Sequence, residues 1–219
     1  MRTQLYSYEY DEITNIANWV IAKYVKSYPL DIYELMASIK TIKFRAYSDG
    51  EESFRTQCLK KSDTGFSFMC GCEMFVIYND DVPRECILFS VLHELGHLAR
   101  EHAVKRELFF DDLCARLDLD ITGEEELVGQ AKEEYEAFCT RQEREAHYFA
   151  DVVAAPNWAI DFVAHKEPWD LCNTFGIGYT CAEIRLKSYR RWVNLGKPKV
   201  SPFEDFNAWS VPINKEGCM

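Results

Sequence analysis

Residues 83–102 have the sequence PRECILFSVLHELGHLAREH and hold the most informative pattern in the chain. We predict one helix here, because proline suits a first helical turn and the apolar residues that follow recur three and four positions apart. These apolar residues are Ile87, Leu88, Val91, Leu92 and Leu95. Gly96 lowers the helix propensity by about 1 kcal/mol, so its presence indicates that another stretch of backbone passes close to this helix.

The same segment contains the pattern HExxH, from His93 to His97. Residues four positions apart project from one face of a helix, so both imidazoles can reach a single Zn²⁺ ion. Glu94 lies beside them, where its carboxylate would polarise a metal-bound water rather than bind the metal. The pattern therefore predicts a catalytic zinc site with His93 and His97 as ligands and Glu94 as the catalytic base.

A catalytic zinc needs a third protein ligand and an open position for water, and residues 143–151 (EREAHYFAD) offer candidates. Glu143 shares a helix face with the small residue Ala146, which would let this helix pack closely with the carboxylate pointing inward. His147 lies on the same face as Glu143, and Glu145 lies on nearly the opposite one. We favour Glu143 as the third ligand, with Glu145 and His147 as alternatives.

Short apolar runs dominate the first half of the chain, and longer helical patterns dominate the second half. We expect an α+β fold in which a small antiparallel sheet of about three strands packs on a mainly helical body. The expected elements are helices at 8–25, 32–39 and 49–61, strands at 42–47, 66–69 and 74–78, and helices at 83–102 and 122–155. We also expect a short helix followed by an acidic connection within 103–121, and two helices within 168–194 that are separated by a turn at 176–178. Thr122 and Glu125 form the capping-box pattern that would start the long helix. We expect a single domain over residues 1–219 with a C-terminal helical extension over about 168–219.

The chain has 219 residues, of which 25 are basic and 36 acidic, so its net charge is −11. This charge argues against binding to nucleic acid or to anionic membranes, which depends on basic surface. Residues 175–192, with Arg185, resemble a helix-turn-helix, but the net charge makes DNA binding an unfavoured interpretation. No apolar run approaches the ~18 residues of a membrane span. The nine cysteines occur without a secretory signal, so we expect reduced thiols and a cytoplasmic location.

Two separated segments together resemble a known family. HELGH follows a predicted hairpin and an Asn-Asp turn, and E-x-x-A-x-x-F-A from Glu143 to Ala150 is followed by Pro156. This combination is similar to the ImmA/IrrE family of zinc metallopeptidases, and the resemblance extends from about Tyr8 to Trp192. It implies a zincin-like body, one Zn²⁺ per chain (Mn²⁺ also suits such ligands) and Glu143 as the third ligand.

The resemblance also implies an intracellular protease of narrow specificity. Its relatives cut a helix-turn-helix repressor, often one encoded beside them on a mobile element or in a stress regulon, so the implied protein substrate is a basic repressor of this kind. The chain departs from the family at His147, where Asp or Asn usually orients a metal-binding histidine. His147 itself or Asp151 would have to take that role.

We therefore carry two hypotheses forward. The first is a zinc endopeptidase, with the strand at 74–78 as a sheet edge that receives an extended substrate peptide. The second is a non-catalytic regulatory protein that binds a repressor or DNA and whose zinc is structural. A fourth protein ligand, such as His147 or a cysteine, would close the metal site and favour the second hypothesis.

Overall fold

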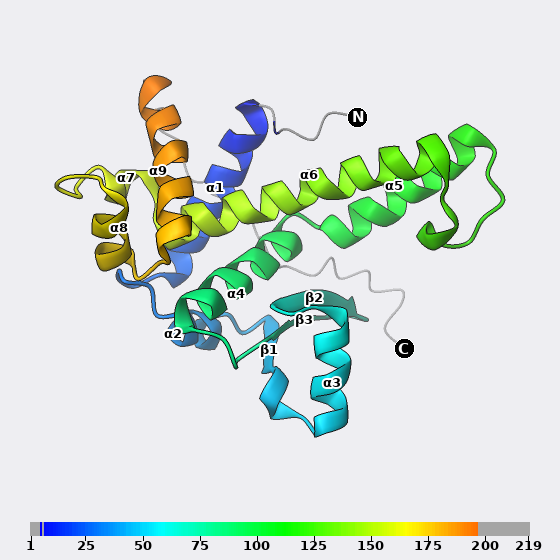
Figure 1. Ribbon diagram of the computed structural model, residues 1–219, viewed down its shortest axis with the longest axis horizontal. Helices are drawn as coiled ribbons and strands as arrows, with labels where there is room; N and C mark the ends of the chain where they lie inside the picture. The colour runs from blue at the N-terminus through cyan, green and yellow to red at the C-terminus, as the bar shows by residue number, and fades with distance from the viewer. Residues whose placement is uncertain (1–4, 6, 197–219) are drawn as a thin grey trace.

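The computed structural model describes Leu5 and residues 7–196, and Figure 1 shows how their helices and strands are arranged. The elements are α1 (Ser7–Tyr24), α2 (Ile32–Ser38), β1 (Ile42–Ala46), η1 (Tyr47–Asp49), α3 (Glu52–Lys61), β2 (Gly65–Cys70), β3 (Glu73–Tyr78), α4 (Arg84–Ala99), α5 (His102–Leu117), η2 (Glu124–Glu126), α6 (Gly129–Ala154), α7 (Asn157–Ile160), α8 (Pro168–Phe175) and α9 (Tyr179–Asn194). The predicted α+β fold is confirmed, because most of the described chain is helical and three strands form a small sheet. Residues 197–219 of the predicted C-terminal extension lie outside the described residues.

Helix α4 occupies the centre of the molecule, with the sheet on one side and α6 on the other (Figure 1). Its apolar face is fully buried at Val91, Leu92 and Leu95. The predicted close approach at Gly96 is confirmed, because a β-carbon added there would lie 3.0 Å from the Cα atom of Ala146 on α6. The pairing of a glycine with an alanine therefore sets how closely the two helices pack.

The sheet has the strand order β1-β3-β2, with β1 parallel and β2 antiparallel to β3. The predicted all-antiparallel sheet is therefore wrong for β1. The chain reverses between β1 and β2 and again in the β2–β3 hairpin, so β3 runs in the same direction as β1 and pairs with it. The prediction that residues 74–78 form a sheet edge is also wrong: β3 carries the buried Met74 and Val76 and is the central strand, whereas β2 forms the edge next to α4.

Helix α4 ends at Ala99, three residues before the predicted end of this helix at residue 102, and the chain bends there before α5 begins. Glu101 has a φ angle of 54°, in the left-handed region, which ends one helix and starts the next in a new direction. Helix α5 then runs alongside α6 (Figure 1). The expected start of the long helix at Thr122 is wrong, because Glu126 accepts hydrogen bonds from the backbone N–H groups of Thr122 and Gly123 in a short turn and α6 begins only at Gly129.

Helices α8 and α9 pack against each other, and α9 contacts α6 and α7. Arg185 of α9 is 1% exposed and donates hydrogen bonds to the carbonyl oxygen of Ala155 and the side-chain oxygen of Asn157, each 2.6 Å long. This arginine is a core residue that joins α9 to the end of α6, so it does not offer its charge to a nucleic acid. Every helix in the described part of the chain is too short or too polar to cross a bilayer.

Candidate metal centre

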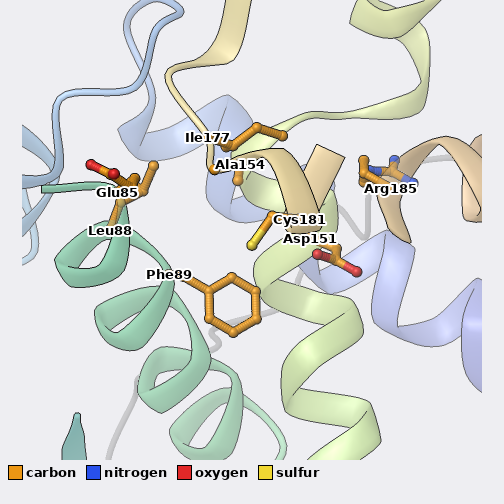
Figure 2. Close-up of a pocket in the computed structure, with 9 residues that line it drawn as sticks. Glu85, Leu88, Phe89, Asp151, Ala154, Ile177, Cys181 and Arg185 are labelled. Atoms are coloured by element: carbon orange, nitrogen blue, oxygen red, sulfur yellow. The ribbon is translucent and has the colours of Figure 1, made fainter. Parts of the chain in front are cut away.

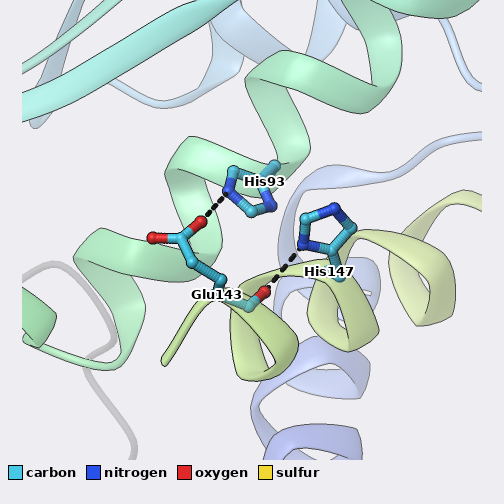
Figure 3. A group of neighbouring side chains, drawn as sticks. All are labelled: His93, Glu143 and His147. Atoms are coloured by element: carbon cyan, nitrogen blue, oxygen red, sulfur yellow. Dashed lines mark hydrogen bonds and ion pairs between the residues drawn. The ribbon is translucent and has the colours of Figure 1, made fainter. Parts of the chain in front are cut away.

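Three side-chain atoms from two helices converge where the sequence predicts a metal. The Nε2 atom of His93 lies 3.0 Å from Nε2 of His97 and 3.1 Å from Oε2 of Glu143, and the latter two atoms are 3.4 Å apart. Figure 3 shows His93 projecting from α4 towards Glu143 on α6. Tetrahedral ligands at 2.0–2.1 Å from a zinc ion are about 3.3 Å apart. Both the spacing and the two-nitrogen, one-oxygen donor set therefore fit Zn²⁺.

Local sequence explains this convergence. His93 and His97 are one helical turn apart on α4, and the Gly96–Ala146 contact brings Glu143 within reach of both. Hydrogen bonds with His93 and His97 hold the pKa of Glu143 well below its ordinary value, although partial burial opposes this. The carboxylate is therefore in the ionised form that a metal ligand requires.

Glu94 lies beside these atoms and is 8% exposed. Its carboxylate accepts a 2.8 Å hydrogen bond from the hydroxyl group of Ser67 on β2. One oxygen of Glu94 and one ring nitrogen from each of His93 and His97 all lie within 4.8 Å of one another. The structure thus brings all four predicted site residues together, and Ser67 fixes the orientation of the predicted base.

The site opens into a cavity of about 600 Å³. One wall is formed by β2, where Ser67 and Met69 face α4 and the neighbouring Phe66 and Phe68 face α3 on the other side of the sheet. The other wall is formed by α4 and the start of α5. Because β2 is the edge strand beside α4, the cavity borders both the sheet edge and the three converging atoms.

Arg106 of α5 also contacts the site, which the sequence analysis missed. Its Nη2 atom donates a 2.9 Å hydrogen bond to Oε1 of Glu143, and its Nε atom donates a 2.6 Å bond to the side-chain oxygen of Gln142. Oε1 of Glu143 is thus held by Arg106 while Oε2 faces the histidines. No sequence pattern connects Arg106 with Glu143, because their contact depends on how α5 packs on α6.

Glu145, one of the alternative third ligands, does not reach the converging atoms. It is buried, its Oε2 atom accepts a 2.8 Å hydrogen bond from Nε of Arg100, and the same oxygen lies 3.2 Å from Nε2 of His102. Burial opposes its ionisation, but the hydrogen bond with His102 and the charge of Arg100 outweigh that effect and lower the pKa of Glu145 to about 2. Glu145 is therefore not a direct metal ligand, because Arg100 and His102 hold its carboxylate on the opposite side of α6 from Glu143.

His147 remains close to the site. Its Nδ1 atom donates a 2.7 Å hydrogen bond to the backbone carbonyl of Glu143 (Figure 3), and its ring lies edge-on to His93 with ring centres 4.4 Å apart. Burial lowers the pKa of His147, and the neighbouring His93 adds to the effect. His93, Glu143 and His147 together form a second group of potential ligand atoms.

Asp151 does not take the orienting role that the sequence suggested. It lines a small cavity with Cys181 and Arg185 between α4, α6 and α9 (Figure 2). Burial raises the pKa of Asp151 to about 7, although the charge of Arg185 opposes this. The Nδ1 atom of His93 is buried and has no hydrogen-bond partner among the described residues.

Comparison with known proteins finds no family model, no curated protein and no solved structure that matches this chain. Two imidazoles, one ionised carboxylate and an adjacent buried carboxylate, at the wall of an open cavity, are the parts that metal-assisted hydrolysis requires.

Proposed function

We propose that this protein is a zinc-dependent endopeptidase of narrow specificity. The observation that carries the proposal is the convergence of His93, His97 and Glu143 to mutual distances of 3.0–3.4 Å beside the carboxylate of Glu94. These three side chains would hold one Zn²⁺ ion and leave a position open to the cavity. Bound zinc supplies a Lewis acid that lowers the pKa of a water ligand towards ~7 and polarises a carbonyl group.

Glu94 is the residue that moves protons. Its carboxylate, oriented by Ser67, would accept a proton from the water molecule as the water oxygen attacks the peptide carbonyl carbon. The same proton would then pass to the leaving amine nitrogen as the C–N bond breaks, which returns Glu94 to its starting state. Arg106 contributes indirectly, by fixing the Glu143 carboxylate.

The edge of β2 supports a peptide as the substrate. Within the described chain this strand pairs only with β3, so its outer backbone groups are available to a further strand. Met69 on the α4 side of β2, and Phe66 and Phe68 on the α3 side, would contact alternate side chains of that strand. An extended segment of a protein therefore fits the cavity better than a folded element does.

A basic helix-turn-helix repressor is the partner we propose, on the strength of the sequence resemblance. The charge of the chain is compatible with it: eight glutamates occur from Glu124 to Glu145 against Lys132, Arg141 and Arg144. Exposed acidic groups on η2 and on the first half of α6 would raise the association rate with a basic partner by long-range attraction.

The test compares the wild type with Glu94→Gln in two assays. Zinc binding is measured by competition with a chromogenic chelator. Cleavage is measured by mass spectrometry on a mixed peptide library and on any helix-turn-helix protein that the neighbouring genes encode. We expect one zinc in both proteins and a loss of cleavage of at least about 100-fold in Glu94→Gln, the usual contribution of general acid–base catalysis. Cleavage by Glu94→Gln at the wild-type rate would contradict the mechanism.

The second candidate function is a non-catalytic protein with a closed structural zinc site. It is favoured by one observation, the proximity of His147 to His93 and Glu143. His147→Ala separates the two candidates. An open catalytic site keeps its zinc affinity in this variant, whereas a site with His147 as fourth ligand loses affinity by more than about tenfold.

A further inference from the structure

His97 contacts a second, fully buried histidine on the side away from Glu143. Its Nδ1 atom lies 2.8 Å from Nδ1 of His102, whose side chain is 1% exposed. The Nε2 atom of His102 lies in turn 3.2 Å from Oε2 of Glu145. A hydrogen-bonded chain thus leads from α4 through the first residue of α5 to α6.

The direction of each hydrogen bond in this chain follows from counting protons. A carboxylate only accepts, so Glu145 requires an N–H group at Nε2 of His102. Burial favours a neutral ring, which carries a single N–H group, so Nδ1 of His102 must accept. The proton between the two rings therefore belongs to Nδ1 of His97, and Nε2 of His97 carries a lone pair.

That lone pair lies where a metal ligand needs it. Nε2 is the atom of His97 that faces Nε2 of His93 and Oε2 of Glu143. Coordination of a metal by one ring nitrogen requires the proton to be on the other. The hydrogen bonds behind His97 therefore select the tautomer that can bind a metal.

Arg100 keeps Glu145 in place as an acceptor. Its Nε atom donates a 2.8 Å hydrogen bond to Oε2 of Glu145, and its Nη1 atom is paired with Glu12 of α1 at 2.6 Å. Both Arg100 and Glu145 are buried. The orientation of the Glu145 carboxylate is thus fixed by an arginine that is itself anchored to a third helix.

We propose that Glu145 is a positioning residue that acts through His102 to hold His97 in its metal-binding tautomer, an inference that rests on the metal centre of the proposed function. Glu145 thereby supports the metal site from two hydrogen bonds away instead of binding the ion. The two ligand histidines differ in this respect, because Nδ1 of His93 has no partner within the described chain.

Glu145→Met tests the proposal by removing the acceptor while keeping a side chain of similar length. Without a carboxylate at its Nε2 atom, His102 can carry its N–H group at Nδ1 and donate to His97, which places the proton of His97 on Nε2. We expect the dissociation constant for Zn²⁺, measured by chelator competition on folded protein, to rise about 10–100-fold. Glu145→Gln is the rescue variant, because an amide oxygen at the position of Oε2 still accepts from both Arg100 and His102, and it should bind zinc nearly as the wild type does. The control is Glu134→Met, which alters another arginine-paired glutamate of α6 and should leave the constant unchanged. Equal zinc affinity in wild type and Glu145→Met would overturn the proposal.

A second measurement needs no metal. Long-range ¹⁵N–¹H NMR of the metal-free wild type, labelled at its five histidines, should show His97 protonated at Nδ1, with the signal assigned through His97→Gln. Protonation at Nε2 in the wild type would overturn the proposal. A wild type with the Nδ1 proton but no zinc affinity would instead reject the proposed enzyme and leave the tautomer assignment standing.

Discussion

The two halves of α6 have different surroundings. From Glu145 to Ala154 most side chains are buried, and small residues face α4. From Gly129 to Thr140 the one buried side chain of this helix is Ala131, and Glu133 and Glu136 are exposed. Glu143 lies at the boundary, where it is buried enough to meet the histidines and open enough to border the cavity. A single helix therefore provides both a rigid support for the site and a charged surface, and the position of Glu143 between them determines its role.

The largest effect should come from the boundary residue itself. Structural zinc sites have binding free energies of about 10–16 kcal/mol, shared among about four ligands. Loss of one ligand should therefore cost up to about 4 kcal/mol of binding free energy, or roughly 1,000-fold in affinity. We expect this loss in Glu143→Ala, measured by chelator competition. Glu136→Ala, in the exposed half, is the control and should bind zinc as the wild type does. Full zinc affinity in Glu143→Ala would transfer the third-ligand role to another residue.

The buried half should not tolerate a larger side chain. Ala146 is fully buried against Gly96, so Ala146→Leu must push α6 away from α4. Overpacking of this kind should lower the free energy of unfolding by about 3 kcal/mol, the upper end of the usual range. The same change at the half-buried Ala137 should alter it by less than about 0.5 kcal/mol. Equal effects at both positions in urea unfolding would show that the two halves pack alike.

Asp151 gives the buried half a pH dependence. Its pKa is about 7 in the folded chain and about 3.9 in an unfolded one, so between these values the folded state binds more protons. The contribution of Asp151 to stability is therefore present at low pH and is lost as the pH rises through 7. We expect the wild type to lose about 2 kcal/mol of unfolding free energy relative to Asp151→Asn between pH 5 and pH 7. Parallel pH profiles for the two proteins would disprove the assignment.

We expect the smallest change in stability at the end of α5. Helix α5 and the first half of α6 form an arm, and the chain turns at Asp118 between them. Asp118 ends α5 with a φ angle of 52°, a left-handed conformation that glycine adopts without a steric cost. Asp118→Gly should raise the free energy of unfolding by less than about 1 kcal/mol and leave zinc affinity unchanged. A drop in zinc affinity would mean that the arm and the metal centre are more closely coupled than their packing indicates.

Local patterns in the sequence predicted the parts of the site that local geometry controls. The spacing of His93 and His97 follows from one helical turn, and the glycine between them correctly indicated a close neighbour. Helical periodicity predicts that Glu145 lies opposite Glu143, as it does in the structure, but periodicity carries no information about what Glu145 contacts. That contact depends on the bend at Glu101, which turns the start of α5 beneath α4.

The contributions of Ser67 and Arg106 could not be predicted for a similar reason. Ser67 reaches Glu94 because β2 lies at the edge of the sheet, and that follows from β1 pairing with β3. Arg106 reaches Glu143 because the chain reverses after α5 and α6 runs back alongside it. Both contacts join segments far apart in the chain, and neither residue type nor spacing carries a signal for them.

The edge position of β2 limits which conformations of a target protein the proposed peptidase could cut. A segment can pair with a strand edge only after it gives up its own hydrogen bonds, so cleavage within a folded domain would first require local unfolding, which occurs rarely in a stable core. Linkers and chain ends meet this requirement at no cost. The lifetime of a target would then be governed by how often its connecting segments are exposed, and a partner that covers such a segment would protect it.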